Sequence, residues 1–268
     1  MDGDTRGVLY PVRLPSMHRL PAPADVASLV RWFWIPEWDL PTGRVSRQQV
    51  LPFPACNLVV EQTGVGVAGP TTRRSTRDLT GRGWAVGALL HPAAVPRLVG
   101  DPNRLSDSYE PVSAADLHAR VARAMTATGV DGDRRRAAAV EAFAAWLSDT
   151  VPAPDAEALL ANELAAVIDG DASIVRVEQV AERLGISVRT VQRLARRYVG
   201  LPPLSMIRRR RLQEAAAVLR SDPAVSVAQV AADLGYADQA HLAADFRTVL
   251  GLTPSAYRAD AGREVRRP

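Results

Sequence analysis

The sequence predicts an α+β protein of two domains, with a β-rich N-terminal domain that ends in helices and an all-α C-terminal domain. Three observations support this division. Residues 1–112 alternate short apolar runs with proline and glycine, residues 113–150 have helical periodicity, and residues 173–258 contain one helical pattern written twice. With 268 residues, 47% of them hydrophobic and 23% charged, the chain has enough apolar side chains for two cores.

The first 112 residues consist of strand-length segments bounded by turns, which is typical of a compact β-rich domain. The apolar runs cover residues 29–38, 44–52, 56–62, 65–70 and 83–92.

Two helices are expected over residues 113–150, and we assign residues 1–150 to the first domain. The apolar faces of these helices would either cap the β-rich part or contribute to a homodimer, and we expect a homodimer. The residues concerned are Leu117, Val121, Met125, Val140, Phe143, Trp146 and Leu147.

Residues 151–155 read as a linker, and residues 155–260 as the second domain, followed by a basic tail over 261–268. The first helix of this domain is expected over 155–170. Two further units follow near residues 177–199 and 227–250. Ala181 and Gly185 of the first unit recur as Ala231 and Gly235 of the second.

Each unit has the pattern of a helix-turn-helix. A small alanine permits two helices to cross closely, and glycine permits a left-handed turn between them. Ser187 and Asp238 are the predicted N-caps of the second helix of each unit. Apolar residues at 191, 195 and 198, and at 242, 246 and 249, would face the core and leave the opposite face free for a DNA groove. The alternative is a helical repeat without a nucleic-acid role.

A connecting helix is expected to begin at Pro203 and to carry a buried stripe that includes Val218. About eighteen residues at ~1.5 Å each span roughly 27 Å, which is of the order of one turn of B-DNA, ~34 Å. Two recognition helices could therefore enter successive major grooves. The four arginines at 208–211 favour phosphate binding, since nine arginines between Arg189 and Arg220 meet one acid, Glu214. The alternative for the run is a solvated helix face.

Residues 203–258 carry a specific set of spaced positions. They are Pro203, Ile207, Arg211, Leu212, Ala215, Val218, Leu219, Val227, Val230, Ala231, Gly235, Tyr236, Gly251, Thr253, Pro254, Tyr257 and Arg258. On these residues the last hundred positions resemble the AraC/XylS family of bacterial transcription regulators. Departures from the family pattern are Met206, Ala195 and Leu242, which stand where the family usually has aromatic residues.

The front half carries a weaker likeness, in Trp32–Trp34, residues 51–58, Gly69-Pro70 and the stretch from His91 to Ala94. It is similar to the β-rich, cupin-like sensing domain of some AraC-type regulators. The resemblance implies a small-molecule effector or dimerisation for this domain. We expect the effector pocket to involve Trp32, Trp34, Cys56 and His91.

The expected function is a sequence-specific DNA-binding transcription regulator. The expected partners are double-stranded DNA, a small effector, RNA polymerase and a second copy of the chain. Glutamine can pair with adenine and arginine with guanine. Base contacts are expected at Arg189, Gln192, Arg193, Gln239 and His241. Phosphate contacts are expected at Ser187, Arg196, Arg208 and Arg247.

The second unit differs from the first, because Ala240, Ala243 and Ala244 stand where Arg189, Gln192 and Arg193 stand in the first. Alanine has no hydrogen-bonding group for a base edge.

We therefore expect an asymmetric reader in which the second unit mainly anchors the protein to the DNA backbone. The alternative is that Gln239 or His241 reads bases instead.

The alternative classes of function are a non-specific architectural DNA-binding protein and an enzyme fused to a DNA-binding module. The histidines at 18, 91, 118 and 241 have no metal-ligand spacing, and no catalytic constellation or cofactor motif is recognisable. We therefore expect no catalysis, metal or cofactor. A single cysteine, the lack of a signal-peptide pattern and the lack of a long apolar run predict a cytoplasmic, nucleoid-associated protein without membrane contact.

Overall fold

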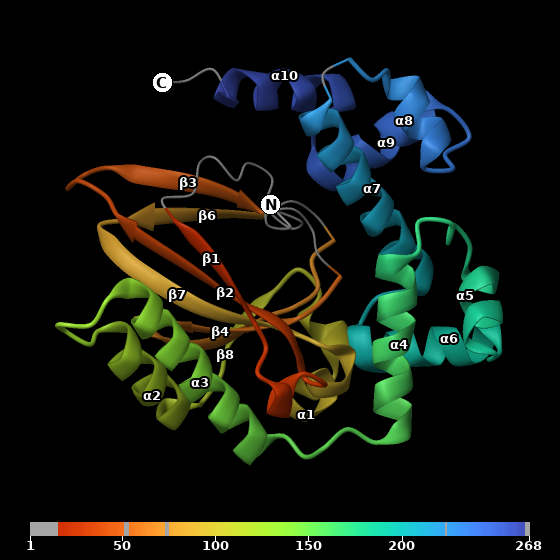
Figure 1. Cartoon of the computed structure of the whole chain (residues 1–268). Coiled ribbons are helices and arrows are strands. Elements are labelled where there is room, and N and C mark those ends of the chain that lie inside the picture. Colours follow the sequence, from red (N-terminus) through yellow and green to blue (C-terminus); the bar gives the residue numbers. More distant parts are fainter. Residues whose placement is uncertain (1–15, 51–53, 73–74, 223, 266–268) are drawn as a thin grey trace.

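The computed structural model describes residues 16–50, 54–72, 75–222 and 224–265 and has the predicted α+β class, with a β-rich domain followed by a helical one (Figure 1). The main sheet has six antiparallel strands in the order β1-β2-β7-β4-β5-β8, and β3 pairs separately with β6. The strands are β1 (Met17–Pro21), β2 (Val30–Asp39), β3 (Val45–Val50), β4 (Asn57–Glu61), β5 (Gly64–Ala68), β6 (Ser75–Thr80), β7 (Arg82–Leu90) and β8 (Tyr109–Pro111).

The main sheet buries one face under two helices, α2 (Ala115–Met125) and α3 (Gly132–Thr150), while the β3-β6 ribbon lies on its other side (Figure 1). Alternation along β2 sends Phe33 and Ile35 into the core, and the Phe33 ring meets Phe143 of α3 edge-on with centroids 5.3 Å apart. Trp32 and Trp34 share the opposite face of this strand, as the alternation predicts.

The apolar faces of α2 and α3 are used inside their own domain. Leu117, Val121, Phe143 and Leu147 are fully buried in one core with the sheet, and Trp146 packs against it. These helices therefore cap the β-rich part, which was the alternative to the expected dimer surface. The homodimer stays a prediction, and it would have to use other side chains.

Four short segments complete the first domain: η2 (Ala24–Val26), η3 (Pro92–Ala94), α1 (Val95–Val99) and η4 (Pro102–Leu105). The last three follow β7 and contact the helical domain. Residues 151–155 then lead into α4 (Ala156–Gly170), whose N-cap Asp155 accepts a hydrogen bond from the Ala158 N–H. Helix α4 stands between the sheet and the next two helices, α5 (Val177–Leu184) and α6 (Val188–Leu194) (Figure 1).

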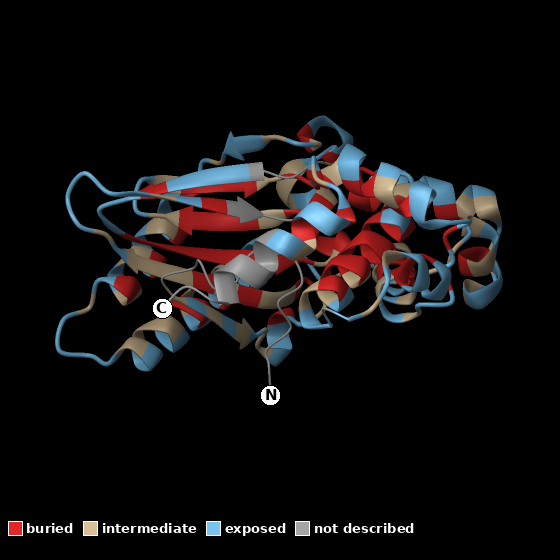
Figure 2. Ribbon diagram, turned by 90° about the horizontal axis from the view of Figure 1, so that it is seen from above, coloured by how far each residue is buried: buried red, intermediate tan, exposed pale blue. Residues whose placement is uncertain are grey.

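The helical domain continues with α5 (Val177–Leu184), α6 (Val188–Leu194), the π-helical turn η5 (Ala195–Val199), α7 (Pro203–Ser221), α8 (Val227–Asp233), α9 (Gln239–Leu250) and α10 (Pro254–Val265). Helix α7 begins at Pro203, as predicted, and belongs to two cores. Its first half places Met206 and Ile207 in the core of α4, α5 and α6, and its second half places Leu212 and Leu219 in the core of α8, α9 and α10. Figure 2 shows buried residues running inside both domains.

Two details differ from the sequence pattern. Val218, expected in the buried stripe of α7, is 38% exposed, so the stripe is narrower than predicted. Helix α10 extends to Val265 into the expected basic tail, whose last residues, 266–268, lie outside the described residues.

Candidate nucleic-acid interface

The first unit has the predicted helix-turn-helix geometry. Val180 and Ala181 of α5 are buried where α5 and α6 meet, and Gly185 adopts the left-handed conformation with φ of 64°. The Ser187 hydroxyl accepts a hydrogen bond from the Thr190 N–H at 3.1 Å and so caps α6. The turn fixes α6 across α5, as the crossing of two short helices through a small residue requires.

Helix α6 buries one face and leaves the other open. Val191, Leu194 and Ala195 are fully buried in the core of the first unit. The opposite face is polar, exposed and basic. It carries the predicted DNA contacts Arg189, Gln192, Arg193 and Arg196.

The end of α6 widens into the π-helical turn η5, in which the Gly200 N–H donates to the Ala195 carbonyl at 2.9 Å. The wider turn keeps Tyr198 and Val199 buried while Arg196 and Arg197 stay exposed.

One residue beside this face was not found from the sequence. Glu157, in the first turn of α4, accepts hydrogen bonds from Arg193 and Arg197 at 2.7 Å each. These arginines hold the pKa of Glu157 below its usual range, with the Arg193 hydrogen bond as the main cause. Sequence separation hid the contact, since Arg193 comes 36 positions after Glu157.

The second unit repeats the geometry with a different surface. Gly235 is left-handed with φ of 70°, and the Asp238 carboxylate caps α9 by accepting from the His241 N–H. The outer face of α9 carries the three alanines, of which Ala240 and Ala244 are exposed and Ala243 is half-buried. The predicted contacts Gln239, His241 and Arg247 are exposed on the same helix.

A stack of three side chains fixes the start of α9. The His241 ring meets the Tyr236 ring edge-on at 5.2 Å, and the Arg211 guanidinium lies 3.7 Å from the centroid of Tyr236. Arg211 also donates through Nε to the Leu234 carbonyl at 2.7 Å. The stack connects α7 to the exposed His241 ring.

The arginine run of α7 is mostly internal, so the expectation that it faces phosphates is wrong for three of its four members. Arg209, Arg210 and Arg211 are buried, and only Arg208 has an exposed side chain. Arg210 donates to the Ile174 carbonyl at 2.6 Å in the segment that precedes α5. The run lies where α7 passes between the two units, and its buried guanidinium groups bond to backbone carbonyls and, for Arg210, also to the Glu214 carboxylate.

These contacts hold the two units at a fixed spacing. Arg210 bonds to the first unit, and Arg211 bonds to the second. The units also touch directly, because a Cβ at Gly235 would lie 3.1 Å from Cγ1 of Val175. A shared helix that contributes to both cores, together with these bonds, joins the two units directly.

The other predicted phosphate contacts, Arg208, Arg247 and Ser187, differ in their surroundings. Arg208 pairs with Asp245 of α9 at 3.2 Å, so its guanidinium is partly engaged by an acid. Arg247 is exposed near the C-terminal end of α9, and the Ser187 hydroxyl is engaged in its cap and by Thr190. The phosphate roles of these residues stay predictions.

Polar contacts join the two domains at α4 and η5. Arg31 of β2 pairs with Asp169 of α4, and Asn162 of α4 bridges the Ala93 N–H and the Ser28 carbonyl at 2.8 Å each. Asn103 of η4 donates to the carbonyl of Arg196 at 3.0 Å. The N-terminal domain therefore touches the turn that ends the predicted recognition helix.

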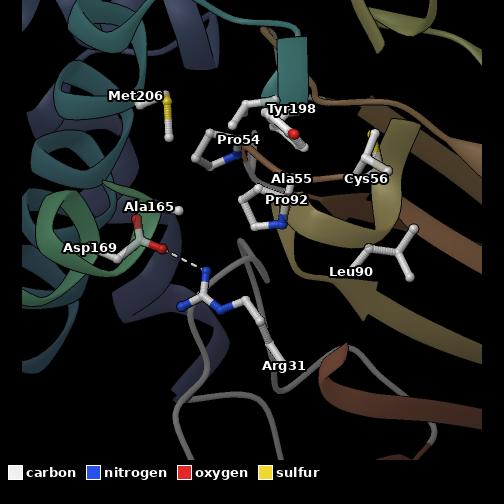
Figure 3. A pocket seen from close by; sticks show the side chains of 12 residues that line it. Arg31, Pro54, Ala55, Cys56, Leu90, Pro92, Ala165, Asp169, Tyr198 and Met206 are labelled. Atoms are coloured by element: carbon white, nitrogen blue, oxygen red, sulfur yellow. Dashed lines mark hydrogen bonds and ion pairs between the residues drawn. The ribbon is translucent and has the colours of Figure 1, made fainter. Parts of the chain in front are cut away.

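A narrow pocket lies between the domains beside the Arg31–Asp169 pair (Figure 3). Cys56, Tyr198 and Met206 line it from three different parts of the chain. Its enclosed space holds about one water molecule. The pocket in this state is therefore a packed seam between the domains.

The four residues predicted for an effector pocket do not share this seam. Of them, Cys56 lines it, whereas Trp32, Trp34 and His91 do not.

The two tryptophans have partners on the outer face of β2. The Trp34 indole donates to Asn57 at 2.9 Å and lies against Gly87, while Arg19 and Arg31 stack on Trp32.

Burial governs the chemistry of the other two residues. It raises the pKa of the Cys56 thiol to about 12, so the thiol is protonated at neutral pH. Burial, aided by the nearby Arg31 charge, lowers the pKa of His91 to about 4. Cys56 thus has the environment of an inert core thiol.

Within the described part of the chain, no three or more metal-binding side chains form a cluster. The same residues include no helix that is long and apolar enough to cross a membrane.

Comparisons with known proteins agree with the geometry of the helical domain. A family model described as a helix-turn-helix domain matches residues 180–260. The transcriptional activator AarP of Providencia stuartii is 32% identical over 103 residues, which make up 38% of this chain and 76% of AarP. The transcriptional activator RhaS of Escherichia fergusonii is 35% identical over 103 residues, or 38% of this chain, and the chain spans only 36% of its length.

The front half matches a different family model, a domain of unknown function (DUF6597), over residues 18–109. Among solved structures, ToxT of Vibrio cholerae O395 superposes with a TM-score of 0.41 at 12% identity, covering 91% of this chain and 95% of ToxT.

The duplicated helix-turn-helix, the motif residues of α7 to α10 and the match to AarP point to one family. The chain belongs to the AraC/XylS family of bacterial transcription regulators.

Proposed function

We propose that this protein is a sequence-specific DNA-binding transcription regulator whose two helix-turn-helix units enter successive major grooves on one face of the duplex. The observation that carries the proposal is that α7 joins the two units through two cores and through Arg210 and Arg211. The 19 residues of α7 at ~1.5 Å each span roughly 28 Å, of the order of one turn of B-DNA, ~34 Å.

Sequence reading is assigned to the first unit. The exposed face of α6 presents Arg189, Gln192 and Arg193, whose side chains can pair with guanine and adenine edges in the major groove. Arg196 follows one turn later and is assigned to a phosphate. Four polar side chains on one open face, opposite a fully buried face, is the arrangement that a recognition helix needs.

Backbone anchoring is assigned to the second unit. The alanines of α9 offer no hydrogen bond to a base, and Arg247 supplies a positive charge for a phosphate. Gln239 and His241 are the competing base readers in this unit, since both are exposed and the His241 ring is supported by Tyr236.

Control is assigned to the N-terminal domain, which we propose responds to a small effector. The support is the interface itself: Asn103 bonds to the turn that ends α6, and Arg31 bonds to α4. A change in the first domain that shifted η4 or β2 would reach the base-reading helix through these contacts. An effector that binds one interdomain arrangement better than another would shift that equilibrium.

The test is selection of DNA fragments from a random library by the purified chain, followed by binding measurements on the enriched site and on random DNA. Gln192→Ala is expected to cost about 1–3 kcal/mol on the enriched site and to leave binding to random DNA unchanged. Arg247→Ala is the comparison variant, expected to weaken binding to both DNAs alike and to reduce the salt dependence.

A non-specific architectural protein is the second candidate, favoured by the alanine face of α9. It predicts that no motif is enriched and that Gln192→Ala weakens binding to every sequence equally or not at all. That result would refute the proposed sequence-specific function.

A further inference from the structure

Glu157 stands at the junction of α4 and the proposed base-reading helix, and its carboxylate is held from three sides. Its Oε2 accepts from Nη1 of Arg193 at 2.7 Å. Its Oε1 accepts from Nη1 of Arg197 at 2.7 Å and from the Tyr198 hydroxyl at 3.2 Å. Both carboxylate oxygens are therefore satisfied, and one of them is dedicated to Arg193.

The Glu157 side chain is held in place by its own helix and by Tyr198. Glu157 lies in the first turn of α4, where the helix dipole favours a negative charge, and the Asp155 cap fixes that turn. Tyr198 is only 4% exposed and belongs to the core of the first unit. The carboxylate is thus anchored by two backbone elements that do not depend on DNA.

Arg193 projects from the outer face of α6, and its side chain is 51% exposed. A guanidinium has five N–H donors, and reading guanine at O6 and N7 needs two of them. The bond to Glu157 engages Nη1, so Nε and Nη2 can form that pair while the bond is kept. Two guanidinium groups face one carboxylate here, so the cluster of Glu157, Arg193 and Arg197 keeps a net positive charge toward DNA.

We propose that Glu157 is a positioning residue for base reading: it orients the Arg193 guanidinium toward the major-groove edge of a guanine. This inference rests on the proposed function. Holding the side chain before binding removes part of the rotamer entropy that an unsupported arginine loses on the DNA. Glu157 also disfavours contacts of Arg193 with phosphates, because its carboxylate repels them.

The experiment uses the full chain and a motif selected by the wild-type protein from random DNA. The base read by Arg193 is identified first, as the position at which Arg193→Ala abolishes discrimination. The discrimination ratio there is the affinity for guanine divided by the affinity for the other bases. Glu157→Gln is expected to lower this ratio about two- to tenfold, which corresponds to the ordering cost of one long side chain. Ratios at the other positions are expected to stay unchanged.

Two controls separate positioning from net charge and from folding. Glu163→Gln removes the same charge from an exposed position on the same helix and is expected to leave every ratio unchanged. In the Arg193→Ala background, Glu157→Gln is expected to change nothing further at that base. Thermal melts of each variant verify that the helical domain is intact.

A measurement on the free protein adds a readout independent of DNA. In Glu157→Gln, NMR relaxation of the Arg193 Nε–H group is expected to show increased motion, whereas Glu163→Gln leaves it unchanged. Unchanged Arg193 motion, or a discrimination ratio equal to that of the wild type, would overturn the positioning role. An equal loss on all DNA sequences would overturn it too. If the wild-type chain enriches no motif, the proposed function fails, and Arg193 then has no base to read.

Discussion

Replacing Gly200 with alanine tests whether the N-terminal domain contacts the proposed recognition helix as the structure describes. Gly200 ends η5 with φ of 79°, and a Cβ there would lie 2.5 Å from the carbonyl oxygen of Pro102. The left-handed backbone alone costs about 1–2 kcal/mol for a residue with a side chain. The overlap is with backbone, which cannot rotate away, and overpacking of this kind adds about 1–3 kcal/mol. Gly200→Ala is therefore expected to destabilise the protein by about 2–5 kcal/mol.

Gly185→Ala is the matched control, because Gly185 is also left-handed, with φ of 64°, and a Cβ there would meet nothing within 4 Å. It should lose only the backbone contribution, about 1–2 kcal/mol. Both variants are compared by urea unfolding followed by circular dichroism, with limited proteolysis at residues 151–155 as the report on domain separation. Equal destabilisation by the two substitutions, and equal cleavage, would refute the contact between Gly200 and Pro102.

Three further predictions concern ionisable groups and DNA reading. His91 has a pKa of about 4 in the fold and 6.5 as a free side chain, so its contribution to stability is present above pH 6.5 and is lost as pH falls toward 4. The urea midpoint of the wild type should therefore drop between pH 7.5 and 4.5, and in His91→Asn the share of this drop that comes from His91 should be absent. Cys56 has its pKa raised from 9.0 to about 12, so stability should fall as pH rises from 9 toward 12; at pH 8 iodoacetamide should alkylate the urea-unfolded chain and spare the native one. Randomising the bases beneath each unit should show high information under α6 and little under α9, and equal information would show that Gln239 or His241 reads bases.

Much of the architecture is encoded in local patterns. The turn glycines Gly185 and Gly235, the caps Ser187 and Asp238 and the helix-starting Pro203 act on their immediate neighbours, so the sequence alone located the helix-turn-helix units. Apolar runs located β2, β4, β5 and β7 for the same reason. Strand β6 was missed, because its residues, STRDLT, form no apolar run and its strand is defined by pairing with β3.

The candidate DNA-binding site also has one part that the sequence predicts and another that only the fold decides. Helical periodicity determined that Arg189, Gln192, Arg193 and Arg196 face away from the core, because which residues share a helix face depends only on spacing along the chain.

Only the tertiary structure decided which arginines are exposed and able to contact DNA. Arg210 and Arg211 are hidden because α7 passes between two units, and Arg193 is held because the fold brings Glu157 beside it. The physical reason is that a guanidinium is stable in water, beside a phosphate or among buried carbonyl groups. Its role therefore follows from what the folded chain places within hydrogen-bonding distance.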